Sequence, residues 1–82
     1  MASKNEWSGL CKAYGAAVRT RREELELTQE ELGFRSALDR GYLSDVERGK
    51  RNPTLKSMAR IAKALRTKPS QLLLAAEGAA HR

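Results

Sequence analysis

The sequence predicts an all-α fold, a compact bundle of five helices within one domain, and three observations support it. The chain has 82 residues, which is too short for two hydrophobic cores of useful size. Its apolar residues are mostly leucine and alanine, 11 and 12 in number, a bias that favours helix over sheet. These residues also recur at intervals of three and four, which is the period of one face of a helix.

The first expected helix covers residues 8–25, and residues 1–7 are expected to form an N-terminal extension of it. Gly9 and Gly15 weaken the prediction for its first half, because glycine is a poor helix former. One side of this helix has the spacing of a buried face: Trp7, Leu10, Tyr14, Ala17, Val18, Arg21 and Leu25.

The second and third expected helices, residues 29–36 and 40–48, begin at recognisable caps. The Thr28 hydroxyl can accept a hydrogen bond from the backbone N–H of Glu31, whose carboxylate can accept one in return. Asp39 can cap the third helix in the same manner. Because only about three residues separate the two helices, the pair has the arrangement of a helix-turn-helix.

The turn between these helices is suited to a close helix crossing. Gly33 supplies a small side chain at the crossing, and Leu38 can fill the corner with an apolar group. Leu43 and Val46 give the third helix one apolar side, so its opposite side remains open to a partner.

The last two expected helices complete the domain, which is expected to cover residues 8–77. Thr54 caps a helix over residues 55–65, and Pro69 fits the first turn of a final helix that is expected to act in dimerisation. Residues 78–82 are expected to form a flexible tail.

The charge of the chain indicates a polyanionic partner. There are 16 Lys and Arg against 10 Asp and Glu, a net charge of +6. Residues 35–68 contain ten bases and three acids, so one end of the fold should carry a positive field suited to a phosphate backbone.

Several classes of protein are disfavoured by composition. One cysteine, Cys11, and one histidine, His81, provide neither an internal disulfide nor a zinc site of the usual kind, so no metal is expected. No catalytic set or phosphate-binding glycine loop is present, so neither an enzyme nor a cofactor is expected. No apolar run approaches the ~20 residues that span a bilayer. We expect a cytoplasmic protein without membrane contact, and no small-molecule ligand, since no room remains for a ligand domain.

The outer side of the third helix carries side chains suited to base edges. Arg40 can donate two parallel hydrogen bonds to guanine, Ser44 can donate or accept one, and Gly41 allows close approach of the backbone. Asp45 can accept a hydrogen bond from cytosine, although an ion pair with a neighbouring arginine is the favoured interpretation.

The second set of candidate residues suits phosphate oxygens. Gln29 lies at the N-terminus of the second helix, and Tyr42 lies on the flank of the third. The others follow the third helix in a basic exit loop: Arg48, Lys50, Arg51 and Asn52.

Three segments together resemble a known family. They are LTQEEL at residues 27–32, YLSDVERGKRNPTL at residues 42–55 and IAKAL at residues 61–65. The combination resembles the Cro/repressor-type helix-turn-helix regulators of phages and bacteria, the lambda repressor-like DNA-binding domains. Within that family, residues 38–44 and the small size are similar to the controller proteins of restriction–modification systems.

The resemblance implies a homodimer that regulates transcription by binding a pseudo-palindromic double-stranded DNA operator through residues 40–48. It also implies an ion pair between Arg22 and Glu47 with a structural role. Two residues depart from the family pattern. Ala37 stands where glycine is usual at the turn, and Phe34 stands where a polar residue is common, so that it is either exposed or part of a larger core.

The three leucines of the final helix raise an alternative. Leu72, Leu73 and Leu74 cannot all face one small core, because three adjacent positions cover most of the circumference of a helix. We expect them to form the dimer interface. In the alternative function, the chain is an antitoxin or protein-interaction module whose C-terminal helix binds a partner protein.

Overall fold

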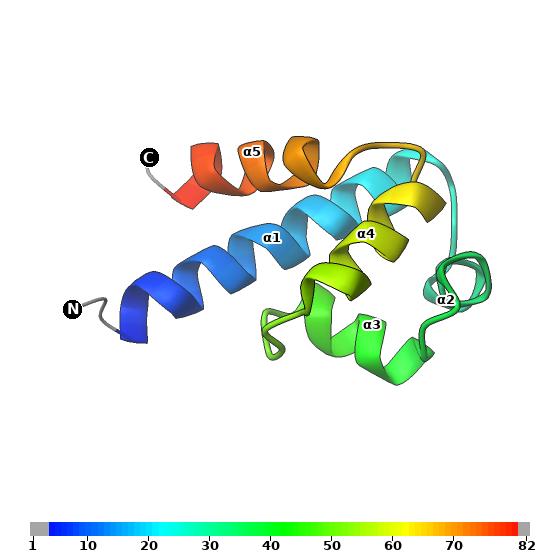
Figure 1. Cartoon of the computed structure of the whole chain (residues 1–82), viewed down its shortest axis with the longest axis horizontal. Helices are drawn as coiled ribbons and strands as arrows, with labels where there is room; N and C mark the ends of the chain where they lie inside the picture. The colour runs from blue at the N-terminus through cyan, green and yellow to red at the C-terminus, as the bar shows by residue number, and fades with distance from the viewer. Residues whose placement is uncertain (1–3, 81–82) are drawn as a thin grey trace.

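The computed structural model describes residues 4–80, and the side chains of residues 8–79. This part of the chain contains five helices and no strand, which confirms the all-α prediction (Figure 1). The helices are α1 (Lys4–Glu24), α2 (Gln29–Ser36), α3 (Arg40–Glu47), α4 (Leu55–Ala64) and α5 (Pro69–Ala80).

Each helix contributes one apolar side to a single core. The long α1 and the shorter α5 lie side by side and antiparallel, while α2, α3 and α4 pack below them (Figure 1). The largest fully buried side chains lie on α1, α2, α3 and α4 and at the C-cap of α4: Val18, Leu32, Leu43, Val46, Ile61 and Leu65. Leu72 and Ala76 close the core from α5.

The two ends of the domain compare differently with the sequence-based boundaries. The first helix begins at Lys4, so residues 4–7 extend it in the way expected for the N-terminal residues, and residues 1–3 lie outside the described part. The last helix continues through Gly78 to Ala80, so the flexible tail predicted from residue 78 is wrong for residues 78–80. A glycine between helix-forming neighbours costs only about 1 kcal/mol, which does not have to end a helix.

A glycine allows α1 to contact α3 directly. A Cβ atom at Gly15 would lie 2.7 Å from the Glu47 carbonyl oxygen and closer still to that of Val46. Only a hydrogen atom fits between these helices, so the residue that weakened the helix prediction is the one that permits this packing.

The turn between α2 and α3 contains a strained residue. Ala37 has φ 58° and ψ 35°, the left-handed conformation that glycine adopts without strain. Its backbone N–H donates to the Gly33 carbonyl, as does that of Leu38. A Cβ atom at Gly33 would lie 2.9 Å from the Leu38 carbonyl oxygen, so the small residue predicted at this crossing is required.

Candidate nucleic-acid interface

The N-terminal end of α3 is exposed because its cap and its apolar side fix its orientation. The Asp39 carboxylate accepts a hydrogen bond from the backbone N–H of Tyr42 at 3.2 Å, which confirms the predicted cap. Leu43 and Val46 are buried against the other helices. The opposite side is therefore open to a partner. It carries the four residues predicted to read bases, of which two are exposed and two half-buried: Arg40, Gly41, Ser44 and Asp45.

A shared hollow brings most of these residues together. Gln29 from α2 and three residues of α3 (Arg40, Gly41 and Ser44) line a surface hollow of ≈ 240 Å³. Among the described residues, the side chain of Arg40 makes no ion pair or hydrogen bond. The N–H groups of its guanidinium are therefore available as hydrogen-bond donors to a ligand that enters the hollow.

Asp45 does not line the hollow and is paired with arginines instead. One of its carboxylate oxygens accepts a hydrogen bond from Nη2 of Arg48 at 2.9 Å, and the other lies 3.6 Å from Nε of Arg51. The Arg51 guanidinium also lies over the Tyr42 ring, 5.2 Å from its centre. The favoured interpretation of Asp45 as a tether matches this geometry.

The loop after α3 is turned outward by a left-handed glycine. Gly49 has φ 75°, and its N–H donates to the Val46 carbonyl, while the Lys50 N–H donates to the Asp45 carbonyl. These two bonds form a Schellman motif, which ends the helix and satisfies its last carbonyl groups. Lys50 and the two residues after it are exposed, so the predicted basic loop lies at the surface next to α3.

A buried ion pair lies beneath this surface. Two nitrogens of Arg22, Nε and Nη2, donate to the Glu47 carboxylate at 2.7 and 3.0 Å, and Nη1 donates to the Leu27 carbonyl at 2.7 Å. The two side chains are only 12% and 3% exposed. Hydrogen bonding to Glu47 raises the pKa of Arg22 above its ordinary value. The pair implied by the family resemblance is thus confirmed, and it joins the end of α1 to the end of α3.

Gln29 connects the buried pair to the hollow, a link that the sequence analysis missed. Its amide Nε2 donates to Oε1 of Glu47 at 3.1 Å, while the same side chain lines the hollow. The capping box at Thr28 fixes the start of α2 next to it, and those hydrogen bonds lower the pKa of Glu31. The link joins residues on α1, α2 and α3 that are distant in the sequence, so only their long-range spacing could have indicated it.

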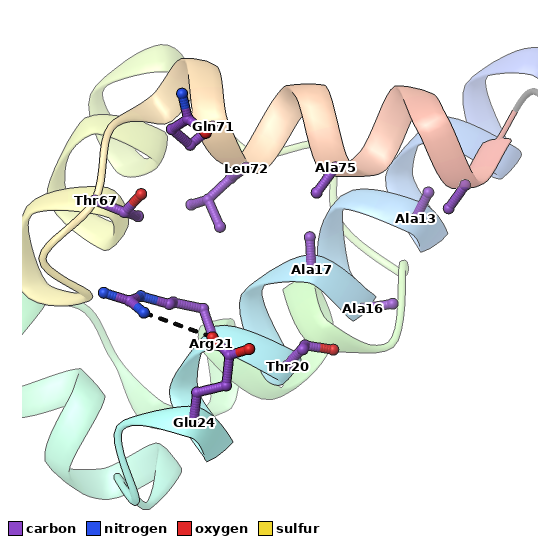
Figure 2. Close-up of a pocket in the computed structure, with 11 residues that line it drawn as sticks. Ala13, Ala16, Ala17, Thr20, Arg21, Glu24, Thr67, Gln71, Leu72 and Ala75 are labelled. Atoms are coloured by element: carbon purple, nitrogen blue, oxygen red, sulfur yellow. Dashed lines mark ion pairs between the residues drawn. The ribbon is translucent and has the colours of Figure 1, made fainter.

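The three leucines of α5 do not share one face. Leu72 is 4% exposed and points from α5 toward α1 (Figure 2), so the prediction that it forms part of a dimer interface is wrong. The reason is that α5 packs mainly on α1, and Leu72 and Ala76 are the α5 residues that enter the core. Leu73 is half-buried, and Leu74 is exposed, so these two remain available to a partner.

The alternative for Phe34 is resolved in favour of exposure. This side chain on α2 is 90% exposed and takes no part in the core.

Within the described residues, no group of three or more His, Cys, Asp or Glu side chains could hold a metal ion. Nor is any helix in that part of the chain both long and apolar enough to cross a membrane.

Comparison with known proteins gives one family. The helix-turn-helix family HTH_3 matches residues 18–72. The chain is 43% identical over 61 residues to the control protein C.BamHI of Bacillus amyloliquefaciens, covering 73% of this chain and 75% of that protein.

Solved structures of similar proteins have the same fold. The restriction-modification controller protein C.AhdI of Aeromonas hydrophila is 40% identical with a TM-score of 0.74, covering 76% of this chain and 94% of that one. The controller protein C.Esp1396I, solved as a tetramer in complex with its natural 35 base-pair operator, is 32% identical with a TM-score of 0.79. That match covers 89% of this chain and 96% of the other.

Proposed function

Because the chain belongs to the helix-turn-helix family, we propose that it regulates transcription by binding specific double-stranded DNA through α3 in the major groove. The observation that carries this proposal is the hollow lined by Gln29, Arg40, Gly41 and Ser44, which gathers hydrogen-bonding side chains at the free end of α3. The regulatory relatives, including a controller bound to its operator, support the same function.

Base recognition falls to the exposed N-terminal part of α3. Arg40 donates two hydrogen bonds to guanine, and Ser44 contacts a base one helical turn further along. Gly41 has no side chain and allows the backbone to approach the base edges. Asp45 lies on the same side, but its carboxylate is occupied by Arg48 and Arg51, so its contribution to base reading is indirect.

Phosphate contacts surround this surface and supply affinity without sequence information. Lys50 and Arg51 extend from the loop after α3, and Gln29 lies at the N-terminus of α2. The remaining members of this set flank them on α3 and the loop: Tyr42, Arg48 and Asn52. The overall charge of +6 favours approach to the duplex.

The protein acts as a homodimer without cofactor or catalytic activity, located in the cytoplasm, and resembles restriction–modification controllers in its role. A two-fold dimer matches a pseudo-palindromic operator whose half-sites lie about one helical turn (~34 Å) apart. The similarity to C.AhdI and C.BamHI supports this assignment.

The test begins with selection of bound duplexes from a random DNA pool, which gives the operator. Arg40→Ala is then expected to weaken operator binding by about 1–3 kcal/mol and to relax sequence choice at one base pair. Lys50→Ala is the matched control, because it should weaken operator and random DNA to the same extent and lower the salt dependence. An unchanged ratio of operator to random-DNA affinity in Arg40→Ala would remove the base-reading role.

A further inference from the structure

The loop after α3 lies against the N-terminal half of α1, and a glycine makes this contact possible (Figure 1). A Cβ atom at Gly49 would lie 2.6 Å from Cγ of Lys12 and 2.8 Å from its Cα atom. A larger residue would therefore push α1 away from the loop. Lys12 is held directly beside the residue that joins Arg48 to Lys50 in the basic loop.

Two further contacts fix the same side of α1 to the end of α3. Gly15, three residues after Lys12, leaves space for only a hydrogen atom next to the Glu47 carbonyl oxygen. Arg22, further along α1, forms the nearly buried ion pair with the Glu47 side chain. Because these contacts are made on folding, the backbone of Lys12 has a set position relative to the basic loop.

The ammonium group of Lys12 is available to a partner. The contact with Gly49 uses the aliphatic stem of Lys12, and the residue as a whole is exposed. Its side chain makes no ion pair or hydrogen bond with any other described residue. Arg19, the next base along α1, is by contrast paired with Glu23 at 3.3 Å.

We propose that Lys12 is a further phosphate-binding residue, whose ammonium contacts the DNA backbone together with Lys50. The helix α1 thereby becomes part of the DNA interface, next to α3 and the loop that follows it. This inference rests on the proposed function, because it adds a contact to the surface that binds the duplex.

The charges around the loop favour a phosphate chain as the partner. Asp45, the acid on the outer side of α3, is already paired with Arg48 and Arg51. Within the described part of the chain, Lys12 and Lys50 therefore have no acidic partner. Like charges held at one surface repel each other, and a phosphate group placed among them relieves that repulsion. A duplex bound to α3 supplies such phosphates at regular spacing.

The test measures the salt dependence of DNA binding by fluorescence anisotropy on the selected operator and on random duplexes. Lys12→Met keeps an apolar stem over Gly49 but removes the charge. We expect the slope of the logarithm of the binding constant against the logarithm of salt concentration to become less steep by about 0.9, the value for one phosphate contact. Operator and random DNA should weaken by the same factor, because a phosphate contact carries no sequence information.

Two variants separate a local contact from a change in net charge. Lys63→Met removes the same charge from an exposed base on α4 that makes no ion pair among the described residues, and its slope should equal that of the unchanged protein. Lys12→Arg keeps the charge and should retain the full slope. Lys12→Gln is a second neutral variant with the same expected shift as Lys12→Met, and circular dichroism checks that each variant is folded.

The outcomes distinguish this inference from the proposed function. Folded Lys12→Met and Lys12→Gln with the slope of the unchanged protein would overturn the phosphate contact, and so would an equal shift in Lys63→Met. A loss confined to the operator would assign Lys12 to base reading and overturn the inference as well. Failure of the unchanged protein to select any duplex would instead contradict the proposed function.

Discussion

Two carboxylates of α3, Asp45 and Glu47, are only two residues apart, and both pair with arginine, yet they lie on opposite sides of the helix. Glu47 faces inward and binds Arg22 in a nearly buried pair. Asp45 faces outward and binds Arg48, and both of those side chains remain substantially exposed to solvent. The comparison shows that burial, rather than the kind of contact, decides what an ion pair does in this protein.

The energetic difference between the two sides is large. Exposed pairs are typically worth 0.2–1 kcal/mol, about the thermal energy, so the arginines around Asp45 can exchange that partner for a phosphate. Removing one member of a buried pair costs about 3–5 kcal/mol, because the other charge stays behind without compensation. The buried pair of Arg22 and Glu47 therefore stabilises the fold, while the exposed arginines around Asp45 remain free to bind a partner at the surface.

Arg22→Ala should produce the largest effect. Among the described residues it leaves the buried Glu47 carboxylate with the Gln29 amide as its one remaining side-chain partner, so the free energy of unfolding is expected to fall by about 3–5 kcal/mol. Urea denaturation followed by circular dichroism measures this change. Arg19→Ala, which breaks the exposed pair with Glu23, serves as control with an expected loss below about 1 kcal/mol. If Arg22→Ala and Arg19→Ala lost the same free energy of unfolding, the contrast between the buried and the exposed ion pairs would be contradicted.

Ala37→Gly should have an intermediate effect of opposite sign. The left-handed backbone at this position strains alanine but not glycine, so we expect the free energy of unfolding to rise by about 0.5–1 kcal/mol. The change touches neither ion pair, so it provides a purely conformational reference for the charge variants. Thermal unfolding measures it, and a lower melting temperature would show that the strain at this turn is relieved in solution.

Asp45→Asn should have the smallest effect on stability, below about 1 kcal/mol, because only exposed contacts are lost. Its effect should appear in DNA binding, where removal of a negative charge and release of Arg48 and Arg51 strengthen binding to random duplexes and steepen the salt dependence. Fluorescence anisotropy over a salt series measures both. If operator affinity instead fell while random-DNA affinity stayed constant, Asp45 would be a direct base reader.

Local features of the fold were predictable from sequence, and features made by docking were not. The caps at Thr28, Asp39 and Thr54 depend on neighbouring residues, and all three occur as expected. The inward position of Leu72 depends on how α5 lies on α1, and no local pattern specifies that arrangement.

The candidate site was predictable to a similar extent. Helical spacing was sufficient to place Arg40, Gly41 and Ser44 on one exposed side of α3. The pairing of Asp45 with Arg51 depends on the path of the loop after α3, so sequence left its role open. The close contact at Gly15 arises only when α1 meets the rest of the chain, and so does the burial of the Tyr14 hydroxyl, which has no hydrogen-bond partner among the described residues.

The hydrogen bond from Gln29 to Glu47 has a consequence for the entropy of association. The amide is already fixed by a carboxylate that is itself held by Arg22, so this side chain loses little rotational freedom when a ligand arrives. Ordering a flexible side chain at an interface costs about 0.5–1.5 kcal/mol, and the Gln29 side chain is already ordered when the chain folds. In the proposed complex with DNA, the interior of the domain would thereby favour binding without touching the ligand.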